Sequence, residues 1–372
     1  MGYNTDRENG YFQYLHNKSC SSGIPFSGTF ELTSRCNFNC SMCYVHSAGC
    51  SKEYLSADDW KNIAGKAAEH GMLELLLTGG EPLIRDDFDK IYLSLIEMGL
   101  VISLNTNASL LTEEKKKLLA EYPPARMNIS LYGADNKTYE NMCGVPAFDT
   151  VSENIIWLKN EGIPVKINST VTSKNCRDIE KTIDFAKKID VPIKNTTYIF
   201  PRSREYHSDK NYFDALLTAK ESAQCRMRFL EYSKTRGEFY DLCRRMTSGI
   251  ETENVHACSE DGLMKCRAGK DSFWIDFSGK MSFCGLVPGK FDVLSLGFEK
   301  CWESVKNQCR AIRLPSECDS CPDKSFCGVC AASCFCEKGV FDKVPDYMCE
   351  MTKTMKKIAC DYSIMSEGDG IV

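Results

Sequence analysis

Three cysteines near the amino terminus have the spacing of a metal-binding loop. Cys36, Cys40 and Cys43 follow one another as CX3CX2C, directly after a short β-rich stretch. Three thiolates on one loop can hold three irons of a [4Fe–4S] cube, and the fourth iron can then bind a ligand from outside the protein. Structural zinc is the alternative, and it would need a fourth ligand, which His46 could supply. The spacing therefore predicts a metal site, and an open-sided iron–sulfur cube is favoured over zinc.

Cysteine is also dense towards the carboxyl end. The chain has 22 cysteines in 372 residues, and half of them lie between Cys284 and Cys360. The polar amino terminus has no signal-peptide core and no apolar stretch is long enough to cross a bilayer, so a secreted disulfide scaffold or a membrane protein is not indicated. A net charge of −5 without a basic run gives no support to nucleic-acid binding. We expect a cytoplasmic, metal-binding protein.

A second motif follows the cysteine loop after about one βα unit. Thr78, Gly79, Gly80, Glu81 and Pro82 end a β-rich run. Paired glycines let a backbone approach a ligand closely, and a carboxylate can accept a hydrogen bond from an ammonium group. Alone, such a segment could be only a turn. Its place at the end of the next strand favours a binding function.

Short β-rich runs alternate with amphipathic helical segments between residues 28 and 205. This pattern predicts parallel βαβ units, and six of them suit a partial (β/α)6 TIM-like barrel better than a closed barrel of eight. Ligands of such sheets bind at the carboxyl ends of the strands. The expected strands are 28–33, 73–78, 101–105, 127–131, 165–171 and 194–199, and the expected helices start near Ser56 and cover 86–98, 112–122, 148–161 and 175–189.

The cysteine loop, the Gly-Gly-Glu-Pro segment and the barrel pattern together resemble the radical S-adenosylmethionine (SAM) superfamily. The resemblance implies that SAM chelates the open iron and is cleaved reductively to a 5′-deoxyadenosyl radical, which abstracts hydrogen from a substrate. It implies that Cys36, Cys40 and Cys43 hold the catalytic cluster. The SAM contacts it implies are Tyr44, Thr78, Gly79, Gly80, Glu81, Pro82, Asn105, Asn107, Ser130, Asn168 and Thr170. Strand-end capping or core packing is the alternative role for those outside the Gly-Gly-Glu-Pro segment.

The later cysteines resemble the SPASM extension of peptide-modifying radical SAM proteins. They run as CX12GX4C from Cys266 to Cys284 and as CX2CX5CX2C from Cys318 to Cys330, with Cys349 downstream. The resemblance implies two further, fully ligated [4Fe–4S] clusters in a small α+β domain. The implied ligands are Cys258, Cys266, Cys284 and Cys330 for the first auxiliary cluster and Cys318, Cys321, Cys327 and Cys349 for the second. Cys334 or Cys336 could replace Cys330, because the last spacing is one residue short of the commoner pattern, and Cys243 could replace Cys258.

The expected organisation is an extension (1–27), the barrel (28–205), a helical connector (206–257), the auxiliary-cluster domain (258–350) and a helical tail (351–372). Most of the unassigned cysteines, including Cys143, Cys176, Cys225 and Cys360, are expected to be buried thiols without a role.

The resemblance implies oxidative modification of a peptide or protein, forming a thioether or carbon–carbon crosslink. It also implies a flavodoxin- or ferredoxin-type electron donor. Because few residues precede the first strand, a leader peptide would need a separate leader-peptide-binding protein or a groove on the barrel. Alternatives are formylglycine formation, which Gly285 disfavours because sulfatase-maturing relatives carry aspartate there, haem- or quinone-type cofactor maturation, and a non-catalytic electron-transfer protein. The acid–base candidates are Asp276, Asp292, Tyr198 and Arg202.

Overall fold

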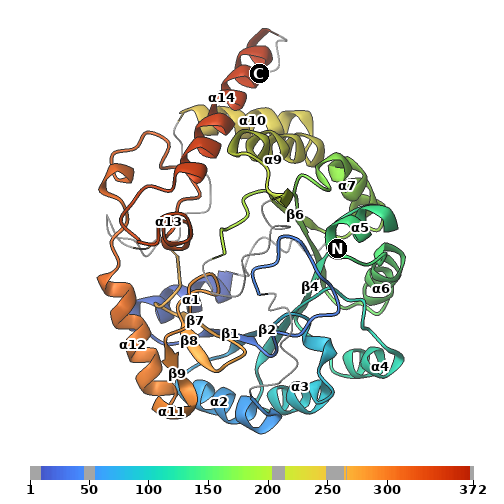
Figure 1. Ribbon diagram of the computed structural model, residues 1–372, viewed down its shortest axis with the longest axis vertical. Coiled ribbons are helices and arrows are strands. Elements are labelled where there is room, and N and C mark those ends of the chain that lie inside the picture. Colours follow the sequence, from blue (N-terminus) through green and yellow to red (C-terminus); the bar gives the residue numbers. More distant parts are fainter. Residues whose placement is uncertain (1–9, 46–54, 203–213, 249–263, 265, 369–372) are drawn as a thin grey trace.

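One curved sheet forms the centre of the protein. The computed structural model describes residues 10–45, 55–202, 214–248, 264 and 266–368, and its nine-stranded sheet has the order β6-β5-β4-β3-β2-β1-β7-β8-β9. In Figure 1 the strands curve around the interior as an open barrel rather than a flat layer. The strands are β1 Ser27–Glu31, β2 Glu74–Thr78, β3 Val101–Thr106, β4 Arg126–Ser130, β5 Val165–Thr170, β6 Ile193–Thr196, β7 Ser272–Ile275, β8 Lys280–Ser282 and β9 Phe291–Asp292.

The first six strands are parallel, and each lies beside the next one in the chain. Such neighbours need a crossover over one face of the sheet, and its right-handed sense places every crossover helix on the same side. Figure 1 shows these helices as an outer ring. All six expected strands are present with bounds shifted by at most a few residues, so the predicted α/β partial barrel is confirmed.

The crossover helices also begin close to where their caps predict. The Ser56 side chain accepts from the amide of Asp59, whose carboxylate accepts from the Ser56 amide, so a capping box starts α2. A short helix, α5, was not predicted, because its eight residues are too few to establish a helical period in the sequence. The helices of this half are α1 Gly10–Ser22, α2 Ala57–Glu69, α3 Phe88–Glu97, α4 Glu113–Glu121, α5 Asn136–Cys143, α6 Phe148–Asn160 and α7 Ile179–Lys188.

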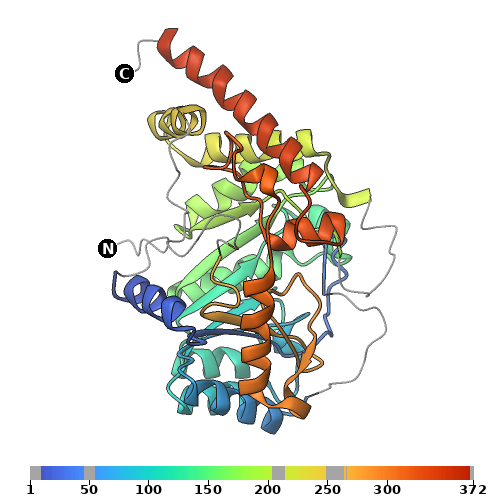
Figure 2. The same ribbon diagram turned by 90° about the vertical axis from the view of Figure 1, so that its left-hand side faces the viewer.

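The carboxyl-terminal half returns to the same sheet. Strand β7 pairs in parallel with β1, and β8 and β9 extend this edge as antiparallel strands. In Figures 1 and 2, α9, α10 and α14 gather at one end of the molecule, while α12 and α13 lie across the open side of the barrel. The helices of this half are α9 Ala219–Ser233, α10 Arg236–Ser248, α11 Val293–Leu296, α12 Phe298–Ala311, α13 Ala331–Lys338 and α14 Asp346–Gly368.

Helix α12 lies in a region for which few long periodic segments were expected. It buries Phe298, Cys301, Trp302, Val305 and Cys309 along one face. Two members of this stripe are cysteines that were left unassigned, and the many cysteines and turn residues around them hid the helical period. Among the described residues, no helix is both long and apolar enough to cross a membrane.

A buried histidine joins α1 to the amino-terminal edge of the sheet. The His16 Nδ1 atom lies 2.9 Å from Oδ2 of Asp271, and Nε2 lies 3.2 Å from Oε2 of Glu74. Burial favours the neutral ring, but the hydrogen bonds with Asp271 and Glu74 outweigh it and raise the pKa of His16 from 6.5 to about 9. The imidazolium therefore links the first helix to β2 and to the turn before β7.

This ion pair predicts a pH-dependent stability. Because the folded-state pKa is raised, the contribution of His16 is complete below about pH 6.5 and is lost as the pH rises through about 9. We expect the free energy of unfolding to fall by roughly 3 kcal/mol across that window. Denaturant unfolding at several pH values measures it. In the His16→Gln variant this part of the pH dependence should vanish, and an unchanged slope would contradict the assignment.

Candidate functional site

A cavity of about 570 Å³ opens at the carboxyl ends of the parallel strands, within the range of ~300–1,000 Å³ for ligand sites. All three cysteines of the predicted loop line it. Nine of the eleven predicted SAM contacts also line it: Tyr44, Thr78, Gly79, Gly80, Asn105, Asn107, Ser130, Asn168 and Thr170. Glu81 and Pro82 do not belong to the lining. The structure therefore brings most of the predicted site to one place.

The cysteine loop is held from behind by the end of α5. The amide of Asn39 donates to the carbonyl of Cys143, and the amide of Ser41 donates to the carbonyl of Met142. Burial raises the pKa of Cys36 far above its ordinary value. These thiols would lose their protons on binding a metal cation, which fits thiolate ligation.

The donor set fits an iron–sulfur cluster better than a single metal ion. In the described part of the chain, no three His, Cys, Asp or Glu side chains converge closely enough to hold one ion. Zinc needs its ligands about 2.3 Å from one centre, whereas a four-iron cube binds each thiolate to a different iron. His46, the candidate fourth zinc ligand, lies outside the described residues.

Gly79 and Gly80 line the cavity and also pack against the segment that leads into the cysteine loop. The amide of Gly80 donates to the carbonyl of Thr33, and the amide of Glu81 donates to the carbonyl of Arg35. A Cβ atom on Gly80 would lie 2.2 Å from the Arg35 carbonyl oxygen, and one on Gly79 would lie 2.6 Å from that of Thr33. The Gly-Gly pair thus allows the strand end to pack directly against the backbone that leads into Cys36.

The Glu81 carboxylate accepts hydrogen bonds from groups of the protein itself. Oε1 accepts from the hydroxyl of Thr106 (2.6 Å) and the amide of Leu83 (3.1 Å), and Oε2 accepts from the amide of Asn107 (2.7 Å). Burial raises the pKa of Glu81 to about 7, against the effect of these hydrogen bonds. In this geometry Glu81 joins the ends of β2 and β3, and its predicted contact with the SAM ammonium group stays a prediction.

Amide side chains form the floor of the cavity. Asn107 donates through Nδ2 to Oδ1 of Asn37 (2.9 Å), next to the Cys36 sulfur at 4.0 Å. Asn105 accepts from Nδ2 of Asn128 (2.8 Å). Asn128 and Thr106 also line the cavity and were missed, although the register pairs Asn105 with Asn128 on neighbouring strands. Inward alternation along the fourth strand could have indicated Asn128.

The predicted ligands of the first auxiliary cluster converge beside this cavity. Burial, and then the nearby Cys330, raise the pKa values of Cys266 and Cys284, and Cys266 also acts on Cys284. Cys336 and Cys309 also lie within electrostatic reach of Cys284. Cys258 lies outside the described residues. Its suggested substitute, Cys243, is instead buried among Met227, Phe239, Met246 and Ala359.

The predicted ligands of the second auxiliary cluster form another group. Cys318 and Cys327 each interact electrostatically with Cys321 and Cys349. The Cys327 sulfur lies 3.4 Å from the hydroxyl of Thr352. Cys334, an alternative for Cys330, is fully buried and lies within electrostatic reach of Cys330 and Cys318.

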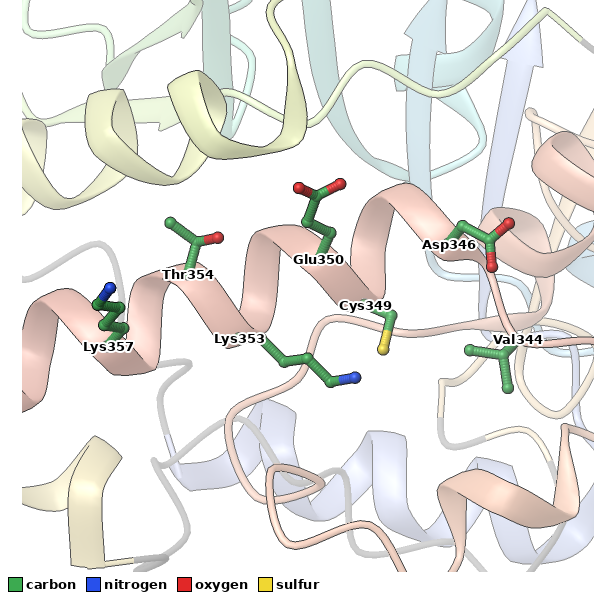
Figure 3. A pocket seen from close by; sticks show the side chains of 7 residues that line it. All are labelled: Val344, Asp346, Cys349, Glu350, Lys353, Thr354 and Lys357. Carbon is green, nitrogen blue, oxygen red and sulfur yellow. The ribbon is translucent and has the colours of Figure 1, made fainter.

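A second hollow, of about 600 Å³, lies along α14. Figure 3 shows Cys349 and Lys353 on one side of the helix, and Glu350 and Thr354 on the other. Asp346 pairs with Lys338, and Glu350 lies 3.9 Å from Lys220. The lining of this hollow therefore has both acidic and basic side chains beside Cys349, a predicted iron ligand.

The four acid–base candidates differ in their hydrogen-bond partners and in whether they line the cavity. Asp276 accepts from Ser278 and from the Lys280 amide in a turn, and Asp292 caps α11 by accepting from the amides of Leu294 and Ser295. Arg202 donates to the carbonyl of Ser41 at 3.4 Å. Tyr198 is the candidate that lines the cavity.

A fourth thiol, Cys143, adjoins the predicted cluster loop. It is fully buried, it is absent from the cavity lining, and its hydrogen bond with Cys40 raises the pKa of Cys40 more than burial does. Beside an iron-bound Cys40 thiolate, the Cys143 thiol would become the hydrogen-bond donor. Such bonds to cluster sulfurs help to set the reduction potential.

We therefore expect the Cys143→Ala variant to keep its full iron content and to lower the reduction potential of the loop cluster by tens of millivolts. Iron analysis and a potentiometric titration followed by electron paramagnetic resonance measure these properties. Loss of iron from the loop would instead identify Cys143 as a ligand.

Comparisons with known proteins agree with this geometry. Residues 30–186 match the family model described as "Radical SAM superfamily". The chain is 28% identical over 327 residues to an AdoMet-dependent heme synthase of Methanosarcina barkeri, covering 83% of this chain and 92% of the relative. It is also 28% identical over 325 residues to the antilisterial bacteriocin subtilosin biosynthesis protein AlbA of Bacillus subtilis, covering 82% and 67%.

Solved structures share the fold. Streptococcus suis SuiB bound to precursor peptide SuiA has a TM-score of 0.63 at 18% identity, covering 92% of this chain and 81% of that one. At that identity the likeness concerns the fold alone. Residues 30–186 thus carry a radical SAM domain, and the three cysteines line the cavity that it forms.

Proposed function

We propose that this radical SAM enzyme oxidatively modifies a peptide or protein, with two auxiliary clusters that remove the electron released on bond formation. The observation that supports it most directly is the shared cavity. Cys284, a predicted ligand of the first auxiliary cluster, lines the same cavity as Cys36 and Cys43, together with its neighbours Gly285 and Leu286. A substrate between them would lie within reach of both the SAM site and an electron acceptor.

The cavity has two different sides. The ends of β3, β4 and β5 contribute amides and hydroxyls, whereas Trp274, Phe283, Leu286 and Phe200 contribute apolar and aromatic surface. Polar groups at fixed positions orient a ligand, and an apolar wall excludes water from reactive species. The superfamily implies a [4Fe–4S] cluster and SAM, which when bound supply a radical for hydrogen abstraction.

In this assignment the strand-end residues Asn105, Ser130, Asn168 and Thr170 orient the polar groups of SAM. The Gly79–Gly80 backbone fixes the loop that carries the cluster ligands. The aromatic wall receives the substrate side chain. AlbA is named for subtilosin biosynthesis, and SuiB was solved with a precursor peptide, which supports a peptide as the substrate.

The test uses anaerobically reconstituted protein. We expect about twelve irons per chain if there are three cubes. With SAM, dithionite and a pool of cysteine-containing synthetic peptides, mass spectrometry should find a peptide that has lost two hydrogens, together with 5′-deoxyadenosine. SAM cleavage without any modified peptide would contradict the peptide proposal but not the family.

Maturation of an iron tetrapyrrole is a second candidate, because the match to the heme synthase spans nearly all of that relative. A parallel reaction with an iron–porphyrin precursor distinguishes the two. Formylglycine formation is less favoured. A Cβ atom on Gly285 would lie 2.5 Å from the Trp274 ring, so an aspartate at this position would displace that ring.

A further inference from the structure

The cavity has few groups that could accept a proton. Its lining, as far as the described residues show it, has no Asp, Glu, His, Lys or Arg side chain. It does contain three tyrosines, Tyr44, Tyr132 and Tyr198. Crosslink formation between a thiol and a carbon radical releases one proton and one electron. The proposed function therefore needs a proton acceptor that the lining does not provide as a free base.

Tyr198 connects the cavity to a carboxylate. Its side chain lines the cavity and is only 7% exposed, and its hydroxyl donates to Oε1 of Glu337 at 2.8 Å. By contrast, the Tyr132 hydroxyl has Ser130 as its hydrogen-bond partner. Tyr198 therefore joins the reaction space to an acidic group outside it.

The ring of Tyr198 is held firmly. It packs edge-on against Phe200 and Tyr347, with ring centroids 4.7 Å and 5.6 Å away. Its hydroxyl donates to the Glu337 carboxylate, so at rest it carries its proton and is directed at that oxygen.

Glu337 is fixed as well. It lies on α13, and its carboxylate accepts from the amides of Tyr347 (2.9 Å) and Met348 (3.3 Å) at the start of α14. It does not line the cavity, and it is half-buried and so partly accessible to solvent. A proton that arrived at this carboxylate could therefore leave to water.

We propose that Tyr198 and Glu337 form the proton outlet of the reaction, an inference that rests on the proposed peptide modification. As the new bond forms, the substrate thiol gives its proton to the Tyr198 oxygen, and Tyr198 passes its own proton to Glu337. The electron goes to an oxidised auxiliary iron–sulfur cluster. The sum is R–SH + R′• → R–S–R′ + H⁺ + e⁻, with the proton on Glu337 and then in water. Tyr198 is the catalytic residue of this relay, and Glu337 is a positioning residue that acts through it.

The experiment compares Tyr198→Phe with the matched control Tyr347→Phe. Tyr347 packs in the same aromatic group but does not line the cavity. Its hydroxyl donates to the carbonyl of Leu217 and lies 2.6 Å from the hydroxyl of Ser222. We expect Tyr198→Phe to form product about 100-fold more slowly. Its iron content should stay close to wild type, and its rate of SAM cleavage should fall far less than its rate of product formation.

The ratio of modified peptide to 5′-deoxyadenosine is the decisive measurement, since a structural defect would lower both together. Tyr347→Phe should keep the wild-type ratio. A ratio within about threefold of wild type in Tyr198→Phe, where Brønsted catalysis predicts far more, or an equal loss in both variants, would overturn the relay. If the wild type modifies no peptide, the proposed function fails and the relay fails with it.

Glu337→Gln gives an independent check if Tyr198→Phe folds poorly. The amide retains an oxygen for the start of α14 but is a far weaker proton acceptor. We expect kcat for peptide modification to fall while KM is unchanged, with a larger solvent isotope effect. A rise in KM with unchanged kcat would assign Glu337 to helix capping only.

Discussion

Replacing Cys36, Cys40 and Cys43 together with alanine will reduce 5′-deoxyadenosine formation to the level of a protein-free control. All three sulfurs line the cavity with the predicted SAM contacts, so their loss removes the ligands of the open-sided cluster. The two auxiliary groups share no cysteine with this loop. About eight of about twelve irons should therefore remain after reconstitution.

Iron analysis, Mössbauer spectroscopy and chromatography of the SAM products measure these quantities. Cys176→Ala is the matched control, because this thiol lies near the start of α7 with its sulfur 3.6 Å from the Ser173 carbonyl, away from all three cysteine groups. Retention of SAM cleavage in the triple variant would mean that another site supplies the open iron. Loss of all irons would mean that the three groups do not bind independently.

The second large effect is expected for Gly80→Ala. A Cβ atom there would lie 2.2 Å from the carbonyl oxygen and 2.7 Å from the carbonyl carbon of Arg35. These are backbone atoms, so the clash cannot be relieved by a rotamer change. We expect the free energy of unfolding to fall by about 3 kcal/mol or more, with the cysteine loop displaced and SAM cleavage lost.

Gly65→Ala is the control for this substitution. Gly65 lies inside α2, where the nearest atom to a new Cβ is the Met98 Cε at 3.9 Å. Alanine there should stabilise the protein by roughly 0.5–1 kcal/mol, because it lowers the entropy of the unfolded chain. Thermal unfolding and SAM cleavage are measured for both variants. If Gly80→Ala unfolds and reacts like wild type, the close packing of the two loops is not required.

The barrel could be predicted because its strands and helices are marked locally. Alternating apolar positions define β3, whose burial alternates residue by residue, and the capping box at Ser56 marks the start of α2. In the carboxyl-terminal half the local signal was weaker. Cysteines at apolar positions concealed α12, and pairing of β7 with β1 joins residues about 245 positions apart, which no local pattern indicates.

The Gly-Gly-Glu-Pro segment likewise has features that the sequence predicts and features that depend on neighbouring strands. The two glycines predicted that the backbone approaches a ligand closely. In the structure, Gly79 and Gly80 lie close to the backbone of residues 33–35. The Glu81 carboxylate accepts from Thr106 and from the amides of Leu83 and Asn107, and its contact with the SAM ammonium group stays a prediction. The direction of a side chain depends on the partners that the neighbouring strands present, and the motif does not contain them.

The sequence by itself determined the chemistry that the chain can carry: the three-cysteine loop, the later cysteine series and the order of strands and helices. Spacing along a chain is enough for these, because thiolate ligation and helical or strand periods are local properties. Tertiary structure alone decided which groups share a space. It placed Cys284 and Cys36 in the lining of one cavity, bonded Glu81 to Thr106 and Asn107, and set Tyr198 against Glu337. Such contacts depend on how distant elements pack, since burial and hydrogen bonding are settled by neighbours in space rather than in sequence.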